Sequence, residues 1–170
     1  KKQKKSILNI IYRHEVLKIN NVLEIYEQVA PDLLLESDLF GAKETRNSLK
    51  ESRYDLPKYL VKMATGTGKT WVMHALLIWQ ILNAKNEKEK SGRFTKNFLI
   101  VAPGLIVYDR LLDAYKGRLQ ENGNGRDFST NDFVRNKDLF VPENYREEVF
   151  SFIQNNTVSK EEGIGSKITG

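Results

Sequence analysis

The stretch that decides the fold of this chain reads Met63-Ala-Thr-Gly-Thr-Gly-Lys-Thr70. Gly66 and Gly68 permit positive φ angles and a close approach to an anion, so that successive backbone N–H groups point inward. Lys69 adds a compact positive charge for the β- and γ-phosphates of a nucleotide, and the hydroxyl of Thr70 is a hard oxygen ligand for Mg²⁺. The pattern therefore predicts a nucleotide-phosphate site, although Met63 occupies the place of the usual first glycine.

The residues around this loop indicate its structural setting, because a phosphate loop follows a strand and opens a helix. Tyr59-Leu-Val-Lys-Met63 predicts the strand, and the apolar run Trp71–Leu82 predicts the helix, whose positive end would face the same phosphates. Phe98-Leu-Ile-Val-Ala102 is a short apolar run typical of a buried parallel strand. Together they predict a right-handed βαβ unit at the start of a doubly wound α/β sheet.

The composition suits a globular protein of one domain, since the chain has 170 residues, 40% of them hydrophobic and 29% charged. The net charge of +5 comes mostly from Lys1, Lys2, Lys4 and Lys5; without them 23 basic residues face 22 acidic ones. The high pI is thus weak evidence for nucleic-acid binding. The absence of cysteine excludes disulfides and thiolate metal sites and is compatible with a cytosolic protein. Because the sequence starts with lysine, we expect a piece of a longer protein.

The N-terminal segment predicts helical structure. Residues 1–5 are expected to form a solvated tail, and Ser6 is a candidate cap for a helix from Ile7 to about Gln28, which Asn20-Asn21 can break in two. Three residues farther along are candidates for adenine recognition, although a solvated face is favoured for them: Arg46, Arg53 and Tyr54.

The helix after the glycine loop is apolar nearly all round, which predicts burial against a sheet. Trp71, Met73 and Trp79 are therefore interpreted as core residues rather than as cofactor contacts. His74 is expected to face a polar edge rather than to bind a metal.

The second half of the chain contains more helix signals. Leu105–Leu119 has apolar positions at helical spacing, and Asn122-Gly-Asn-Gly125 is a turn signal. Pro142 predicts the start of another helix, whereas residues 155–170 are polar and show no core pattern.

Hydrolysis of a nucleotide needs a carboxylate, at the end of a second strand, that holds Mg²⁺. Asp is nowhere followed directly by Glu in this sequence. Asp109, which follows four apolar residues, is the one candidate, but the stretch continues into helical periodicity and a helix position is favoured for it.

The glycine loop Met63–Thr70, followed by Phe98-Leu-Ile-Val-Ala-Pro-Gly-Leu105, resembles motifs I and Ia of superfamily 2 helicases. The resemblance is greatest to the type III restriction enzyme Res subunit and related DEAD/DEAH-box-like proteins, and it covers about residues 57 to 119. It implies an ATP-driven motor on duplex DNA, built from RecA-like domains. Residues 1–55 would then be an N-terminal helical and linker segment, and residues 56–170 a partial RecA-like ATP-binding domain: a P-loop NTPase sheet with flanking helices.

The resemblance also implies roles for individual residues. ATP would contact the glycine loop: Thr65, Gly66, Thr67, Gly68, Lys69 and Thr70. Lys69 and Thr70 would serve catalysis, and Thr70 would bind Mg²⁺. The nucleic-acid backbone would contact Pro103, Gly104 and Leu105, with Arg110 adding charge. A modification (methyltransferase) subunit, an endonuclease activity in the whole enzyme and the cytoplasm of a prokaryote are implied as well, and a membrane is not.

The sequence departs from the family pattern in that motif II, the later helicase motifs with their arginine finger and a nuclease centre are absent. We therefore expect the N-terminal part of a first motor domain, which binds ATP but does not hydrolyse it well. Two alternatives stay open at this point. One is a complete small P-loop NTPase or kinase that uses Asp109 for its metal, and the other is a non-enzymatic interaction domain with a degenerate loop.

Overall fold

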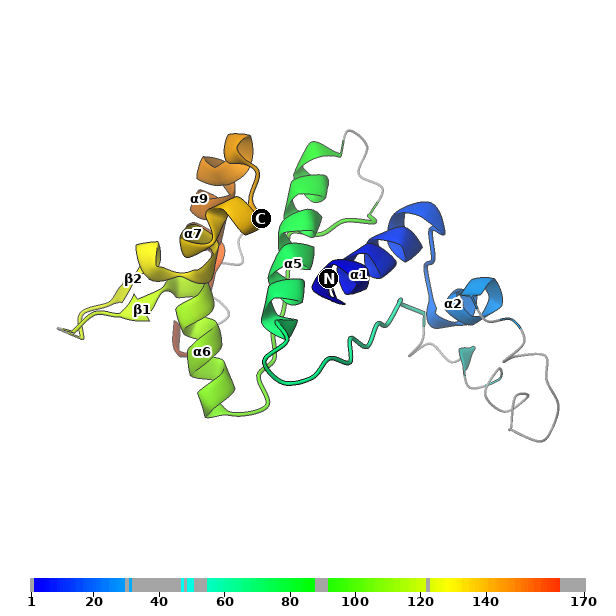
Figure 1. Cartoon of the computed structure of the whole chain (residues 1–170), viewed down its shortest axis with the longest axis horizontal. Helices are drawn as coiled ribbons and strands as arrows, with labels where there is room; N and C mark the ends of the chain where they lie inside the picture. Colours follow the sequence, from blue (N-terminus) through cyan, green and yellow to red (C-terminus); the bar gives the residue numbers. More distant parts are fainter. Residues whose placement is uncertain are drawn as a thin grey trace. The chain divides into compact units, whose positions relative to one another are not determined.

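The structure is a computed structural model, and it describes residues 2–29, 31, 47, 49–50, 55–87, 92–121 and 123–162. The chain divides into two compact units, residues 1–73 and 74–170, and both consist mainly of helices (Figure 1). None of the helices in the described ranges is long and apolar enough to cross a membrane. The candidates for adenine recognition, Arg46, Arg53 and Tyr54, lie outside the described residues.

The first unit begins with helix α1 (Lys2–Ile11), which runs into the π-helical turn η1 (Tyr12–Val16) and is followed by α2 (Val22–Val29). The break before α2 is fixed by a reciprocal capping pair. The side chain of Asn21 accepts a hydrogen bond from the Glu24 N–H at 2.9 Å, and the Glu24 carboxylate accepts one from the Asn20 N–H at 2.7 Å. The predicted break at Asn20-Asn21 is thereby confirmed.

The expected solvated tail was wrong, because residues 2–5 form the first turn of α1. Ser6 is therefore no cap: its hydroxyl donates to the carbonyl of Lys2 at 3.2 Å inside the helix. Lysine and glutamine are good helix formers, so the helix extends backward from the apolar pattern that begins at Ile7 and includes these residues.

The second unit contains most of helix α5 (Lys69–Asn86), which starts at the end of the first unit, and helix α6 (Leu105–Lys116). These two helices confirm the predictions for 71–82 and for the stretch from Leu105, and Asp109 indeed occupies a helix position. The remaining elements are short turns and helices that lie beside α6, with the hairpin β1–β2 extending from its end (Figure 1). They are β1 (Arg118–Leu119), β2 (Arg126–Asp127), η4 (Phe128–Thr130), α7 (Asp132–Arg135), α8 (Lys137–Phe140), η5 (Glu143–Tyr145), α9 (Arg146–Asn156) and η6 (Lys160–Glu162).

The helix expected from Pro142 starts as the turn η5, which Pro142 precedes, and continues as α9. No core pattern was expected in residues 155–170, of which 163–170 lie outside the described residues; part of the described remainder does contribute to packing. Ser159 is buried, and in η6 the carboxylate of Glu162 pairs with the ammonium of Lys116.

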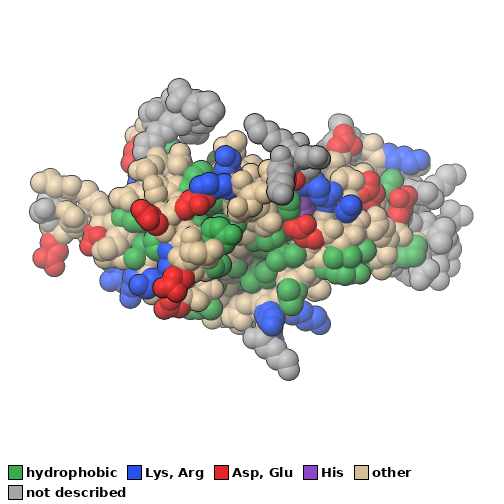
Figure 2. All heavy atoms as spheres, turned by 90° about the horizontal axis from the view of Figure 1, so that it is seen from above, with side chains coloured by type: hydrophobic (Ala, Val, Ile, Leu, Met, Phe, Trp, Pro, Cys, Tyr) green, Lys and Arg blue, Asp and Glu red, His purple; other side chains and the backbone are tan. Residues whose placement is uncertain are grey.

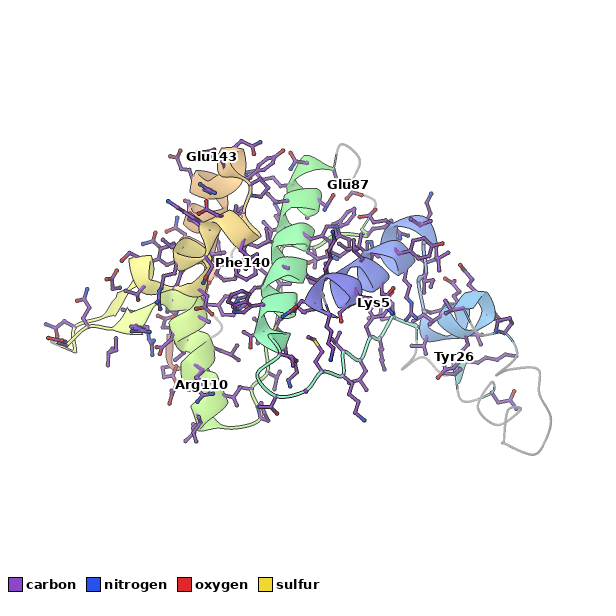
Figure 3. All side chains as sticks on the ribbon, in the orientation of Figure 1. Lys5, Tyr26, Glu87, Arg110, Phe140 and Glu143 are labelled. Carbon is purple, nitrogen blue, oxygen red and sulfur yellow. The ribbon has the colours of Figure 1, made fainter. Side chains whose placement is uncertain are left out.

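The core of the second unit is an aromatic cluster around His74, which is fully buried. Its ring centroid lies 4.6 Å from that of Phe133, 5.2 Å from that of Tyr115 and 5.7 Å from that of Phe140, whose side chain points toward α5 (Figure 3). The expectation that His74 faces a polar edge was therefore wrong, because the packing of α6, α7 and α8 surrounds that side of α5 with rings. Trp71, expected in the core, is 41% exposed.

The expected parallel sheet is not present among the described residues. Neither 59–63 nor 98–102 forms a strand, and the sheet found is the antiparallel pair β1–β2, in which Arg118 pairs with Asp127. The apolar side chains of the two expected strands reach solvent instead: Leu60 is 92% exposed and Leu99 84% exposed. Hydrophobic side chains accordingly appear over much of the face shown in Figure 2. An apolar run gives a tendency to form a strand, but a strand needs a hydrogen-bonded neighbour.

The hairpin is attached to α6 through Gly117, which has a φ of +85°. A Cβ at this position would lie 1.8 Å from the carbonyl oxygen of Asp127. The guanidinium of Arg126 closes the same corner, donating to Asp113 at 2.6 Å and to the carbonyl of Gly117 at 2.8 Å. Only glycine fits between α6 and β2.

We predict that Gly117→Ala lowers the free energy of unfolding by about 3 kcal/mol or more, because a backbone carbonyl must move and the φ is strained. The control is Gly123→Ala, where φ is +70° but no atom lies within 4 Å of the added carbon. This substitution should lower the free energy of unfolding by about 1 kcal/mol, from the strain of the positive φ angle alone. Urea titration followed by circular dichroism measures both, and equal losses would contradict this account of the corner.

The buried imidazole of His74 predicts a pH dependence. Neither ring nitrogen has a hydrogen-bond partner among the described residues, and burial lowers the pKa of His74 from 6.5 to about 4. Between these values the unfolded chain binds a proton that the folded chain does not, so stability is complete above pH 6.5 and falls as the pH drops toward 4. The loss should approach about 3 kcal/mol at pH 4. In His74→Leu, the difference in unfolding free energy between pH 7 and pH 5 should shrink; an unchanged difference would exclude His74 as its source.

Candidate functional site

The glycine loop has the backbone conformation that the sequence predicts. Gly66 has a φ of +76° and Gly68 a φ of +85°, both in the left-handed region that favours glycine. Between them, Thr67 folds back on the residue three positions earlier: its N–H and its hydroxyl both donate to the carbonyl of Ala64, at 3.3 Å and 2.6 Å. The loop is therefore a closed turn.

Lys69 is the first residue of α5, and its side chain folds back over the loop. The ammonium donates to the carbonyls of Met63, at 2.9 Å, and of Ala64, at 3.2 Å. A positive charge thus lies directly on the turn made by the two glycines. Phosphate oxygens that enter the loop can take the place of these carbonyls as acceptors.

Thr70 follows as the second residue of α5 and is exposed. The first turn of the helix contains no acidic side chain, so the positive end of its dipole is not compensated there. An exposed hydroxyl can bind a cation, and a helix N-terminus without acidic side chains attracts an anion such as a phosphate.

Helix α1 lies against the loop, which the sequence reasoning missed. The amide of Gln3 donates to the carbonyl of Thr67 at 2.8 Å, and a Cβ on Gly68 would lie 3.0 Å from the same Nε2 atom. A pocket of about 300 Å³ opens between the helix and the loop. The helix-forming lysines and glutamine at the start of the chain could have predicted α1. Nothing in the sequence indicates that this helix contacts a loop 64 residues away.

The second predicted segment, Pro103-Gly104-Leu105, opens helix α6 in the other unit. Gly104 precedes the helix in an extended conformation, and no side chain caps the helix start. Leu105 is 79% exposed, and the first turn contains no acidic residue. Arg110, farther along the same helix, is exposed as well (Figure 3).

One turn into α6, the hydroxyl of Tyr108 donates to the carboxylate of Glu161. This bond raises the pKa of Tyr108 and lowers that of Glu161, so the carboxylate is charged at neutral pH.

Comparison with known families gives one match. A family model described as "Type III restriction enzyme, res subunit" matches residues 4–164. The chain belongs to this family. No curated protein and no solved structure matches the chain.

Membership in the Res family confirms the resemblance drawn from the two motifs. It implies a P-loop NTPase fold and an ATP-dependent, helicase-like domain of a type III restriction enzyme, with DNA as a consistent partner. The matched range also includes most of α1, so the helix beside the loop belongs to the family domain.

The residues of the loop fit the nucleotide that the Res family implies. Two left-handed glycines, a lysine on the turn and an exposed helix start suit phosphate groups. For Mg²⁺, the chain offers the hydroxyl of Thr70. The part of the chain that the structure describes has no group of three acidic or histidine side chains for a metal, so phosphate oxygens and water would complete the shell. Asp109 lies on α6, in the other unit.

Proposed function

We propose that this chain is the ATP-binding part of a DNA translocase or helicase subunit of a type III restriction enzyme. The observation that carries the proposal is the loop itself: two glycines with left-handed φ angles lead directly into Lys69 at the start of a helix. Membership in the Res family supports the same nucleotide and a motor function.

The six residues from Thr65 to Thr70 would bind the nucleotide. Their backbone N–H groups would surround the phosphates, and Lys69 would exchange the carbonyls of Met63 and Ala64 for phosphate oxygens. The hydroxyl of Thr70 would help to hold the Mg²⁺ that accompanies the nucleotide. A bound Mg²⁺ supplies charge neutralisation for phosphoryl transfer.

Hydrolysis needs a carboxylate and a group that orients water, and the sequence offers no Asp-Glu pair for them. Asp109 lies within α6 rather than at the end of a strand. We therefore propose that this chain binds ATP without sustained hydrolysis, and that the endonuclease and the modification subunit belong to the whole enzyme.

The finer architecture is part of the same proposal: an N-terminal segment 1–55 and a partial RecA-like domain 56–170, although its predicted strands 59–63 and 98–102 do not form strands among the described residues. The support is that both segments are mainly apolar and that each exposes apolar side chains to solvent, such as Leu60 at 92% and Val101 at 79%. Apolar segments of this kind are stabilised by pairing within a buried sheet.

For duplex DNA, we propose contacts at Pro103, Gly104 and Leu105, with charge from Arg110. The exposed start of α6 offers N–H groups that suit a backbone phosphate, and such contacts carry no base specificity. The chain would then follow the DNA backbone rather than read its sequence.

Lys69→Ala should weaken ATP binding in the presence of Mg²⁺ by about 10- to 100-fold, because a charged hydrogen bond to phosphate is lost. Calorimetry measures the affinity, with phosphate release followed in the same samples. Lys137→Ala removes an exposed lysine on α8 and serves as the control. Equal ATP affinity of all three proteins would sink the nucleotide assignment, and robust phosphate release would contradict the proposed lack of hydrolysis.

Arg110→Ala should weaken binding to duplex DNA about 3- to 10-fold at low salt, and reduce the slope of log affinity against log salt by about 1. Arg110→Lys keeps the charge and should retain most of the affinity. The loss should be the same for unrelated DNA sequences, since a phosphate contact reads no base. Fluorescence anisotropy with a labelled duplex measures these affinities, and wild-type binding by Arg110→Ala would remove this residue from the interface.

A further inference from the structure

We propose that helix α1 forms one wall of the nucleotide site, and that Lys2 and Lys5 are binding residues for the polyphosphate of the nucleotide. This inference rests on the proposed function, because it adds residues to the same site. Figure 3 marks Lys5 on this helix.

The position of α1 is fixed by the loop. Gln3 donates from its amide to the carbonyl of Thr67 at 2.8 Å, and its side chain lies against Gly68, where no Cβ intervenes. Gly68 thus has two reasons to be glycine: its φ of +85° and the close approach of Gln3. This contact places the first turn of the helix at the edge of the phosphate loop.

One face of α1 lines the pocket of about 300 Å³ beside the loop. Its residues follow the spacing i, i+3, i+4 and i+7, which puts them on the same side of a helix. The helix contributes Lys2, Lys5, Ser6 and Asn9, and the chain before and within the loop contributes Lys62, Met63, Ala64 and Thr67.

The charge of this pocket points to an anion. Three of its lining residues are lysines and none is acidic. Lys2 and Lys5 are three positions apart, and like charges at that spacing repel each other. An anion bound between them would offset this electrostatic repulsion. Lys2 is also the first residue of α1, which brings the positive end of the helix dipole to the pocket.

The size and place of the pocket point to the polyphosphate of a nucleotide rather than to DNA. A volume of about 300 Å³ is at the lower end for small-molecule sites. The pocket shares Met63, Ala64 and Thr67 with the loop, and the ammonium of Lys69 lies on the carbonyls of two of them. Phosphates held by the loop therefore extend toward α1, and the lysines of both elements contact one chain of phosphates.

Lys4 provides a matched control. It lies on the same helix and carries the same charge, but it is exposed and does not line the pocket. A general effect of net charge would cost Lys4→Ala, which removes one charge, half of the binding free energy that is lost when both Lys2 and Lys5 are replaced. A local effect would weaken ATP binding in the variant of the pocket lysines and leave it nearly unchanged in Lys4→Ala.

Calorimetry with ATP and with inorganic triphosphate, both with Mg²⁺, tests the proposal on the whole chain. The double variant Lys2→Ala/Lys5→Ala should bind both ligands about 10-fold more weakly than wild type, because two charged contacts are lost. Lys4→Ala should stay within about 2-fold of wild type, since its exposed side chain does not line the pocket and makes no contact with the ligand there. Circular dichroism should give the same helix content for the two variants, because both change exposed lysines of one helix.

Three results would overturn the inference. Equal affinities of the double variant and Lys4→Ala, with a loss in Lys69→Ala, would leave the proposed function standing and remove α1 from the site. Tighter binding by the double variant would mean that α1 obstructs the loop. Wild-type chain that binds neither ligand would sink the proposed function together with the inference.

Discussion

The hydrogen bonds from the ammonium of Lys69 to the carbonyls of Met63 and Ala64 are the interaction on which the site depends. They hold a cation on a turn that the N–H and the hydroxyl of Thr67 also close, by donating to the carbonyl of Ala64. The loop therefore has its shape without a phosphate, and in the proposed site binding would exchange two carbonyl acceptors for phosphate oxygens. Pre-organisation of this kind lowers the entropic cost of binding.

The sequence predicted well what short-range rules determine. The left-handed angles at Gly66 and Gly68, the helix that starts at Lys69 and the helix from Leu105 all follow from residue type and from spacing over a few positions. The interpretation of Asp109 as a helix position depended on the same periodicity and was confirmed. Membership in the Res family could likewise be predicted from two motifs, and the family match over residues 4–164 confirms it.

What the sequence did not indicate depends on contacts between distant segments. Gln3 meets Thr67 across 64 positions, and His74 is enclosed by rings from three other helices. No local pattern specifies which partner a side chain will have. The expected sheet shows the same limit: the apolar run 98–102 was visible in the sequence, whereas its neighbours in a ladder were not, and the structure gives it none among the described residues.

That run has a consequence for the behaviour of the chain in solution. Phe98–Ala102 carries no charge, and Leu99 and Val101 are each more than three-quarters exposed. A bare apolar segment of high strand propensity is a template on which a second molecule can add a strand, which is the first step of aggregation. Lys96 and Pro103 stand on either side of it. A charge and a proline at those places are the gatekeepers that interrupt such growth, and they limit how far intermolecular pairing can spread along the chain.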